Sequence, residues 1–99
     1  MIKRLVQMKL IYGKEVEFLR IFNQVRDKIL SQPGCLELEA WQDDIDGQNG
    51  FWTVSNWASV EDLEAYRQSE LFRSTWAALK PLFASKAKAW TLTEPESLP

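Results

Sequence analysis

The stretch Trp57–Trp76, WASVEDLEAYRQSELFRSTW, decides the fold because a strand gives way there to two capped helical segments. Ser59 precedes Glu61 and Asp62, and acidic side chains in the first turn of a helix interact favourably with its free amides and its dipole. Ser69 is placed to cap a second segment in the same way. The sequence therefore predicts a short helix after Ser59 and another helix after Ser69.

The second of these segments carries a long apolar stripe. Spacings of four, three and four residues separate Phe72, Trp76, Leu79 and Phe83, which is typical of one buried helical face. Pro81 is predicted to weaken the last turn. Residues 86–93 then alternate and predict a final strand, with Ala87 and Ala89 on one side and Lys88, Trp90 and Leu92 on the other.

The first third of the chain shows a strand followed by a helix. Residues 2–11 alternate, with Ile2, Val6, Met8 and Leu10 on one side and Lys3, Gln7 and Lys9 on the other. After Tyr12-Gly13 the spacing changes to three and four, and we expect a helix with its stripe on Val16, Leu19, Phe22, Val25 or Arg26, and Ile29. Pro33-Gly34 ends this helix.

The middle of the chain predicts a hairpin. Residues 35–43 alternate, with Leu36, Leu38 and Ala40 on one face and Cys35, Glu37, Glu39 and Trp41 on the other. The segment Asp44–Gly50 has the composition of a turn. Phe51–Trp57 is then the third strand, and it pairs with the second.

The resulting order is βαββαβ, the ferredoxin-like arrangement of the α+β class, in which a four-stranded antiparallel sheet carries its helices on one face. Ninety-nine residues suit one core. We expect a single domain over residues 1–94 and a flexible C-terminal tail over residues 95–99.

The strands carry aromatic residues on both sides, although a sheet covered on one face usually has a polar second face. Trp41, Trp52 and Trp90 are the strand tryptophans, and aromatic residues are enriched in buried subunit contacts. For Trp52, a place in the helix-facing core is equally consistent with the pattern. We expect a homodimer that forms through the open sheet face and closes into a dimeric α/β barrel.

Composition excludes several classes of partner. Lys and Arg number 12 against 14 Asp and Glu, so the net charge of −2 does not favour nucleic acid or anionic membranes. No segment has the apolar run of a signal peptide or a membrane span. Cys35 is the single cysteine, which excludes an intrachain disulfide and is consistent with a reducing compartment. We expect a soluble, cytoplasmic protein.

A family resemblance rests on two motifs. Pro33-Gly34-Cys35 precedes the second strand, and Trp57-x-Ser59-x-Glu61-x-Leu63-x-x-Tyr66-x-x-Ser69-x-x-Phe72 follows the third. In order and spacing nearly the whole chain resembles the antibiotic biosynthesis monooxygenase family of dimeric α/β barrels. Most of the matched positions are caps, turns and core residues, so they specify the fold and dimerisation more closely than the chemistry.

The resemblance implies two ferredoxin-like subunits packed sheet to sheet, each with a mostly apolar pocket between its sheet and its helices. Active members of the family oxygenate phenols, quinols or polyketide aromatics without a metal or a flavin. Relatives with the same fold degrade haem, isomerise lactones or have no known activity.

The chain departs from the family pattern at several positions. The family commonly has histidine at the position of Tyr66, and often an acid at the position of Ser55. In the haem-degrading branch asparagine lies near Gln7, tryptophan at Tyr66 and the iron-binding histidine at Trp76. The chain has no histidine and no clustered Cys, His and carboxylate ligands, so the usual haem or transition-metal site cannot be assembled. We therefore disfavour haem degradation and expect no metal and no cofactor.

Oxygenation without a cofactor needs a substrate that supplies the electron itself, in a dry pocket that stabilises the developing anion. Tyr66 and Asn56 can donate hydrogen bonds there. A desolvated Glu37, or Glu39, is the candidate base, because tyrosine ordinarily has a pKa near 10. The candidate catalytic residues are therefore Tyr66, Asn56 and Glu37.

The candidate substrate-binding residues are Trp57, Phe72 and Trp76. Five of the six candidates also have a purely structural interpretation. Trp57 suits a packing anchor at the end of a strand, while Phe72 and Trp76 suit an ordinary core stripe. Tyr66 suits a core tyrosine with its hydroxyl at the surface, and strand carboxylates such as Glu37 are usually solvated or paired.

Three hypotheses follow from the sequence. The first is a cofactor-independent monooxygenase-like enzyme acting on a small aromatic or quinol substrate. The second is a non-catalytic small-ligand-binding or regulatory dimer of the same fold, which the missing histidine and the unassigned base favour. The third is a purely structural dimer, which would have a filled core and no cavity beside Tyr66.

Overall fold

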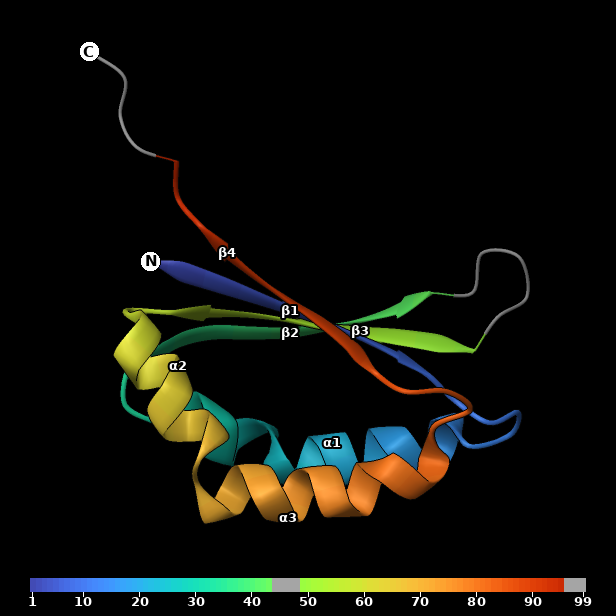
Figure 1. Cartoon of the computed structure of the whole chain (residues 1–99). Coiled ribbons are helices and arrows are strands. Elements are labelled where there is room, and N and C mark those ends of the chain that lie inside the picture. The colour runs from blue at the N-terminus through green and yellow to red at the C-terminus, as the bar shows by residue number, and fades with distance from the viewer. Residues whose placement is uncertain (44–48, 96–99) are drawn as a thin grey trace.

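The chain folds into two layers, a sheet and a set of helices that all lie on one side of it (Figure 1). The computed structural model describes residues 1–43 and 49–95. The elements in order are β1 (Ile2–Lys9), α1 (Glu15–Leu30), β2 (Cys35–Asp43), β3 (Gly50–Trp57), α2 (Val60–Arg67), α3 (Glu70–Leu79), the short 3-10 helix η2 (Lys80–Leu82) and β4 (Lys88–Thr93). The predicted ferredoxin-like α+β fold is confirmed.

Parts of two sequence predictions lie outside the described residues. These are positions 44–48 of the turn Asp44–Gly50 and positions 96–99 of the C-terminal tail. Among the helices that the structure describes, none is long and apolar enough to cross a membrane.

The strands pair in the order β2-β3-β1-β4, and every pairing is antiparallel. Val6 in β1 lies opposite Thr53 in β3 and Ala89 in β4. Since side chains alternate along a strand, Arg4 and Val6 point to the helices while Leu5 between them points away. We call the helix-covered side the inner face and the other side the outer face.

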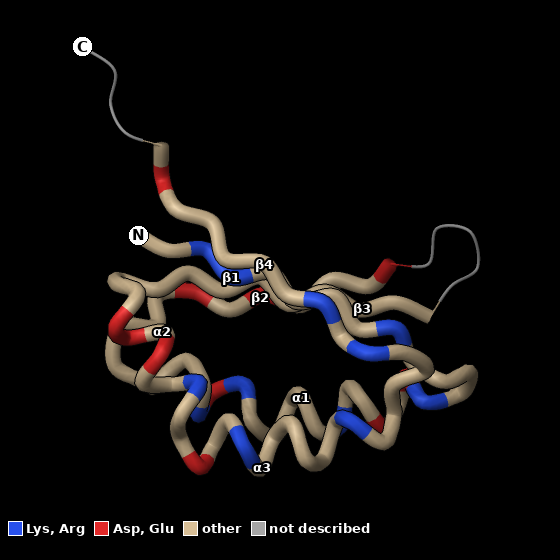
Figure 2. The backbone as a smooth tube through the Cα atoms, in the orientation of Figure 1, with Lys and Arg blue, Asp and Glu red and all other residues tan. Residues whose placement is uncertain are grey.

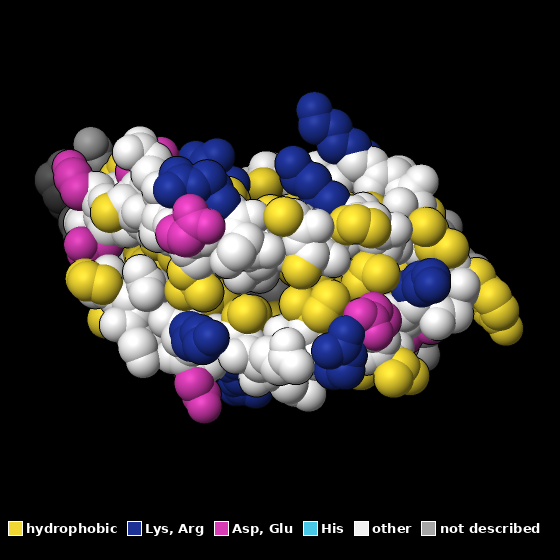
Figure 3. Space-filling model, turned by 90° about the horizontal axis from the view of Figure 1, so that it is seen from below, with side chains coloured by type: hydrophobic (Ala, Val, Ile, Leu, Met, Phe, Trp, Pro, Cys, Tyr) yellow, Lys and Arg dark blue, Asp and Glu magenta, His cyan; other side chains and the backbone are white. Residues whose placement is uncertain are grey.

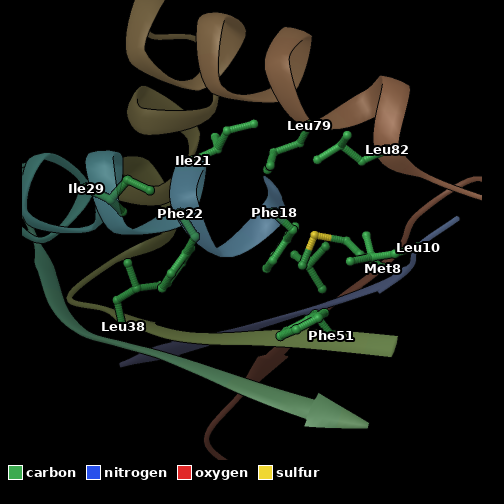
Figure 4. Close-up of a cluster of buried hydrophobic side chains, with 11 residues drawn as sticks. Met8, Leu10, Phe18, Ile21, Phe22, Ile29, Leu38, Phe51, Leu79 and Leu82 are labelled. Carbon is green, nitrogen blue, oxygen red and sulfur yellow. The ribbon is translucent and has the colours of Figure 1, made fainter. Parts of the chain in front are cut away.

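The core fills the space between the inner face and the helices (Figure 4). Phe18 and Met8 are almost fully enclosed, and the Phe18 ring packs on Phe51 with 4.6 Å between centroids. Viewed from the helical side, hydrophobic side chains form a band between charged ones (Figure 3).

The predicted stripe of α1 is confirmed at Phe22, Val25 and Ile29 and wrong at its N-terminal end. The buried residues are Phe18, Ile21, Phe22 and Ile29, whereas Val16 is 78% exposed and Leu19 is also exposed. Both interpretations fit spacings of three and four residues. The larger aromatic side chain decides between them, because burying Phe18 removes more apolar surface from water than burying Val16.

The predicted faces of β2 are wrong at the start of the strand, because it contains a bulge. The pairing with β3 shifts between Cys35 and Glu37, so that Cys35 lies opposite Trp57 and Glu37 lies opposite Asn56. The extra residue, Leu36, is exposed, and Cys35 packs against the core on the side predicted for Leu36. A bulge reverses the alternation on one side of it, which the sequence pattern does not reveal.

The second helical segment ends as Pro81 predicts. α3 stops at Leu79, and η2 carries Pro81 in its first turn. Phe83 follows in an extended conformation and Leu10 forms an isolated bridge with it, so β1 ends at Lys9 rather than Ile11. β4 begins at Lys88, two residues after the predicted start at Lys86.

The outer face carries the three strand tryptophans. Trp41 is 59% exposed and Trp90 is 43% exposed, while Trp52 stacks on Trp90 with centroids 5.7 Å apart. Pairing places Trp90 opposite Leu5 and Trp52 opposite Gln7, both on the outer face. Of the two places left open for Trp52, the structure selects the outer face.

Gly34 lies between the end of α1 and the start of β2, and it packs against the start of α2. Its φ is +79°, and its carbonyl accepts a hydrogen bond from the Ala58 amide at 2.8 Å. A Cβ atom at this position would lie 2.5 Å from the Cβ of Asp62. Gly13 also has a positive φ, of +86°, but has nothing within 4 Å of an added Cβ.

We expect Gly34→Ala to destabilise the protein more than Gly13→Ala. The control Gly13→Ala should lower the free energy of unfolding only by the cost of a left-handed backbone for alanine, about 1–2 kcal/mol. Gly34→Ala adds a collision with Asp62, for about 1–3 kcal/mol more. Urea unfolding of both variants measures the difference, and equal losses would contradict the close approach of α2 to Gly34.

Candidate functional site

Trp57 fixes the first wall of the candidate site. It ends β3 with 0% exposure, and its indole N–H donates to the Ser55 hydroxyl at 3.0 Å. Ile2 of β1 and Leu63 of α2 form a buried cluster with it. The Tyr66 ring stacks on it at 5.0 Å between centroids. Trp57 thus attaches α2 to the end of the sheet and sets the position of Tyr66.

Ser69 fixes the corner between α2 and α3. Its hydroxyl donates to the Tyr66 carbonyl at 2.6 Å and accepts from the Phe72 amide at 3.1 Å. The predicted cap of the second segment is confirmed, as is that of the first, where the Ser59 hydroxyl accepts from the Asp62 amide at 3.1 Å. Holding α2 and α3 at this corner brings Phe72 edge-on to Tyr66, with 5.3 Å between the ring centroids.

The aromatic contacts continue along α3. Trp76 lies 5.7 Å from Phe72 and 5.7 Å from Phe83, in both cases between ring centroids. We call the five rings Trp57, Tyr66, Phe72, Trp76 and Phe83 the aromatic row. Four of the six site residues predicted from sequence belong to it.

Two cavities lie between the inner face and the helices. The first, which we call the inner hollow, has about 70 Å³ and is lined by residues that include Ser55, Trp57, Tyr66 and Phe72. The second, which we call the edge groove, has about 490 Å³ and lies between β1, β4 and the end of α3. Arg4, Val6 and Trp76 line both cavities and separate them.

The two cavities differ in the size of the molecule that each can hold. An apolar cavity of roughly 150 Å³ binds benzene, so an inner hollow of half that size is too small for an aromatic ring. The edge groove falls within the roughly 300–1,000 Å³ typical of small-molecule sites. A ring system therefore fits the edge groove, with Trp76 between it and Tyr66.

Tyr66 is held in its neutral form. Burial raises its pKa to about 12, and the nearby Cys35 adds a smaller effect in the same direction. A phenol with that pKa is not a base near neutral pH, but it donates a hydrogen bond. Tyr66 is thus equipped to stabilise a developing negative charge.

Arg4 is a cation on the inner face of the sheet, where it lines both cavities. Its guanidinium donates to the Thr91 hydroxyl at 2.6 Å, and no described carboxylate forms an ion pair with it. Burial lowers the pKa of Arg4, and the positive charge of Arg67 lowers it further, against the opposing effect of Glu64. The Arg67 charge is in turn paired with Glu64 at 2.9 Å.

The structure does not bring Asn56 and Glu37 to the aromatic row. Ser55 and Trp57 on either side of Asn56 line the inner hollow, so Asn56 points to the outer face. Its amide nitrogen donates to the Glu37 carboxylate at 2.5 Å. The six predicted residues therefore fall into four around the inner hollow and two on the opposite side of the sheet.

Cys35 lies beside the row as a protonated thiol. Burial raises its pKa, with a smaller lowering by its contact with the Glu37 carbonyl at 3.8 Å. A thiol in this state is a small hydrophobic group. Over residues 1–43 and 49–95, no three His, Cys, Asp or Glu side chains gather where they could hold a metal ion.

Sequence reasoning missed Arg4, Lys80, Lys86 and Phe83 as site residues. Phe83 was recognised only as part of the α3 stripe. Arg4 carried a usable signal, because it occupies an inward position between Ile2 and Val6, where a charge is unexpected. Lys80 and Lys86 carried none, since only the path of the chain from α3 to β4 brings them to the groove.

These features define a ferredoxin-like α+β protein with an aromatic-lined site beneath its helices. The antibiotic biosynthesis monooxygenase family model matches residues 1–78. The chain belongs to this family.

Solved structures of the same fold have little sequence in common with the chain. A conserved protein from Methanosarcina mazei Go1 has a TM-score of 0.88 at 14% identity, covering 95% of this chain and 92% of that one. A protein from Caulobacter crescentus CB15 has a TM-score of 0.85 at 22% identity, covering 96% and 90%. A mutant of SnoaB, a cofactor-independent oxygenase from Streptomyces nogalater, has a TM-score of 0.82 at 16% identity, covering 99% and 96%. No curated protein matches the chain.

The raised pKa of the partly buried Tyr66 predicts a loss of stability at high pH. The pKa of Tyr66 is higher in the folded protein than the ordinary value of 10, so as pH rises the unfolded chain loses its proton first. The stabilising effect is complete below about pH 10 and is lost by about pH 12, and it amounts to roughly 2–3 kcal/mol.

Urea unfolding between about pH 9 and 12 tests this. The free energy of unfolding should fall less steeply with pH in Tyr66→Phe than in the wild type. The matched control is Tyr12→Phe, because Tyr12 is 90% exposed, and it should follow the wild type. Identical slopes for all three proteins would show that the Tyr66 hydroxyl is not desolvated.

Proposed function

We propose that this protein is a cofactor-independent monooxygenase that acts on a small aromatic or quinol substrate held in the edge groove. The observation that carries the proposal is the aromatic row, which runs from the inner hollow into the edge groove and includes the neutral phenol of Tyr66. Membership of a family described by monooxygenation supports it.

The chemistry requires no other electron donor. A substrate with an acidic CH₂ group, such as an anthrone, loses one proton to give a carbanion. The carbanion combines with O₂ and a proton to form a C–O bond and a hydroperoxide. The O–O bond then breaks as the remaining C–H proton leaves, which yields a ketone and water. The substrate carbon supplies all four electrons that O₂ accepts.

The residues of the row have separate roles in this proposal. Trp76 and Phe83 hold the ring of the substrate, while Phe72 and Trp57 exclude water from the inner hollow. Tyr66 lines the inner hollow and not the groove, so its hydroxyl donates a hydrogen bond to an O₂ molecule in the hollow as negative charge develops on it. Asn56 and Glu37 lie on the outer face and do not contact a substrate held here, so their catalytic roles stay predictions.

A second candidate function is binding without turnover. Among the described residues that line the edge groove and the inner hollow, none is a carboxylate or a histidine. With Tyr66 neutral, these walls offer no general base of ordinary pKa. This observation favours a small-ligand-binding or regulatory dimer if the substrate does not ionise by itself.

Oxygen uptake distinguishes the two functions. With anthrones and hydroquinones under metal-free conditions, the wild type should consume O₂ faster than the uncatalysed reaction. From ¹⁸O₂, the anthrone product should gain one labelled oxygen atom. Tyr66→Phe should lower kcat by about 10–100-fold, because a donor to the developing charge is lost.

The control for this experiment is Tyr12→Phe, which removes the hydroxyl of a tyrosine far more exposed than Tyr66 and should leave kcat unchanged. An equal loss of rate in both variants would remove Tyr66 from the mechanism. No uptake over the whole panel, together with saturable ligand binding, would establish the binding function instead.

We further propose that the protein is a homodimer formed through the outer face. The apolar side chains exposed or half-exposed on this face are Leu5, Trp41, Trp52, Val54, Trp90 and Leu92. An apolar surface of this kind on a small protein marks a contact with another molecule. A second sheet of the same kind covers it without leaving backbone groups unpaired, because sheets pack through their side chains.

Trp90→Glu should convert the dimer to a monomer at micromolar concentration, since it places a charge in the apolar contact. Sedimentation velocity measures the change. The control is Val16→Glu, which adds the same charge at a 78% exposed position of α1, away from the outer face. A monomeric wild type, or dissociation by Val16→Glu as well, would contradict the interface.

A further inference from the structure

The charged residues that line the edge groove are all cations. Arg4, Lys80 and Lys86 line it, and none of the described lining residues is acidic. The chain as a whole carries a net charge of −2, so this is a local departure from its overall balance. Lys and Arg positions follow the segment that leads from α3 into β4 (Figure 2).

The cations extend beyond the groove itself. A small neighbouring pocket of about 50 Å³ is lined by Lys9, Lys86 and Lys88, again without an acidic residue among those described. Lys86 belongs to both cavities. Lys9 and Lys88 lie on the outer face, so the lysines that line the edge groove itself are Lys80 and Lys86, and these attract anions before any specific contact forms.

Arg4 gives the groove an anion-binding group at its inner end. It lies between the edge groove and the inner hollow, held by the Thr91 hydroxyl, and it has no described carboxylate as an ion-pair partner. A partly desolvated guanidinium is costly to leave unpaired, and its planar fork matches two oxygens of an acid group. The remaining walls offer Val6, Trp76, Phe83 and two alanines, which suit an aromatic surface.

We propose that the edge groove selects an aromatic anion, with its ring against Trp76 and Phe83 and its ionised oxygens on Arg4, while Lys80 and Lys86 attract it at the mouth. This inference deepens the proposed function, since it uses the same groove and names the charge of the ligand. For a ligand whose acidic group is a phenol or an enol, the cation also lowers the pKa of that group, so that its proton passes to water without a protein base.

A non-oxidisable ligand pair tests the inference apart from turnover. We would measure the binding of 2-naphthoate and of 2-naphthamide, its neutral analogue, by calorimetry at low salt. The naphthoate should bind about tenfold more tightly or better, and added salt should reduce the difference. Arg4→Gln should remove most of the preference.

The lysines keep the test valid if Arg4→Gln fails to fold. Lys80 and Lys86 are exposed, and Lys80→Gln or Lys86→Gln should each weaken naphthoate binding about two- to fivefold without affecting naphthamide. The matched control is Lys28→Gln in α1, which lines neither the edge groove nor the small pocket and should change nothing.

Three outcomes would overturn the inference. These are equal affinity for the two ligands, no binding of either, or equal losses in Lys80→Gln and Lys28→Gln. An anion preference without any oxygen uptake would support this inference while refuting the monooxygenase. Oxygen uptake with no anion preference would support the monooxygenase while refuting this inference.

Discussion

The buried Trp57 indole is the contact on which the candidate site depends. It closes the end of β3, packs on Leu63 of α2 and carries the Tyr66 ring on its face. Each following ring of the aromatic row is placed against the one before it, through the Ser69 corner to Trp76 and Phe83. Removing a fully buried tryptophan costs a large part of the stability of a domain of this size, so these positions are fixed before any ligand arrives.

The same packing explains why the cavities are divided. Four rings packed around the inner hollow leave only about 70 Å³, and Trp76 separates this space from about 490 Å³ of open groove. A ring system in the groove meets Trp76 and Arg4 first, whereas the inner hollow has room for only a few small molecules such as water or O₂. Tyr66 therefore lies on the far side of Trp76 from a ring system in the groove, in a largely buried environment where a hydrogen bond is stronger than in water.

Local signals predicted most of the fold from the sequence. Ser59, Ser69 and Pro81 act on the residues beside them, and their caps and helix end appear where the sequence places them. The first turns of the α1 stripe, Val16 and Leu19, were wrong because two apolar faces fit the same spacing there and only packing against β3 decides between them. The face of Cys35 failed because a bulge leaves no mark in the alternation.

The site was less predictable than the fold. A helical stripe located Phe72 and Trp76, and a strand end located Trp57, since these places follow from local periodicity. The separation of Asn56 and Glu37 from Tyr66 depends on which way each strand residue points. The cations at the groove depend on the long-range pairing of β1 with β4, which brings Arg4 beside Thr91.

Strand pleating finally connects the two proposed surfaces of the protein. In β1, Arg4 and Val6 line the cavities while Leu5 between them lies on the apolar outer face. In β4, Ala89 lines the groove and Trp90 beside it lies on the outer face. A shift of either strand by one residue would exchange the two sets. In the proposed dimer, a partner over Leu5 and Trp90 also fixes the register that keeps Arg4 and Ala89 in the groove, so that the proposed dimer contact and the proposed ligand site depend on the same arrangement of β1 and β4.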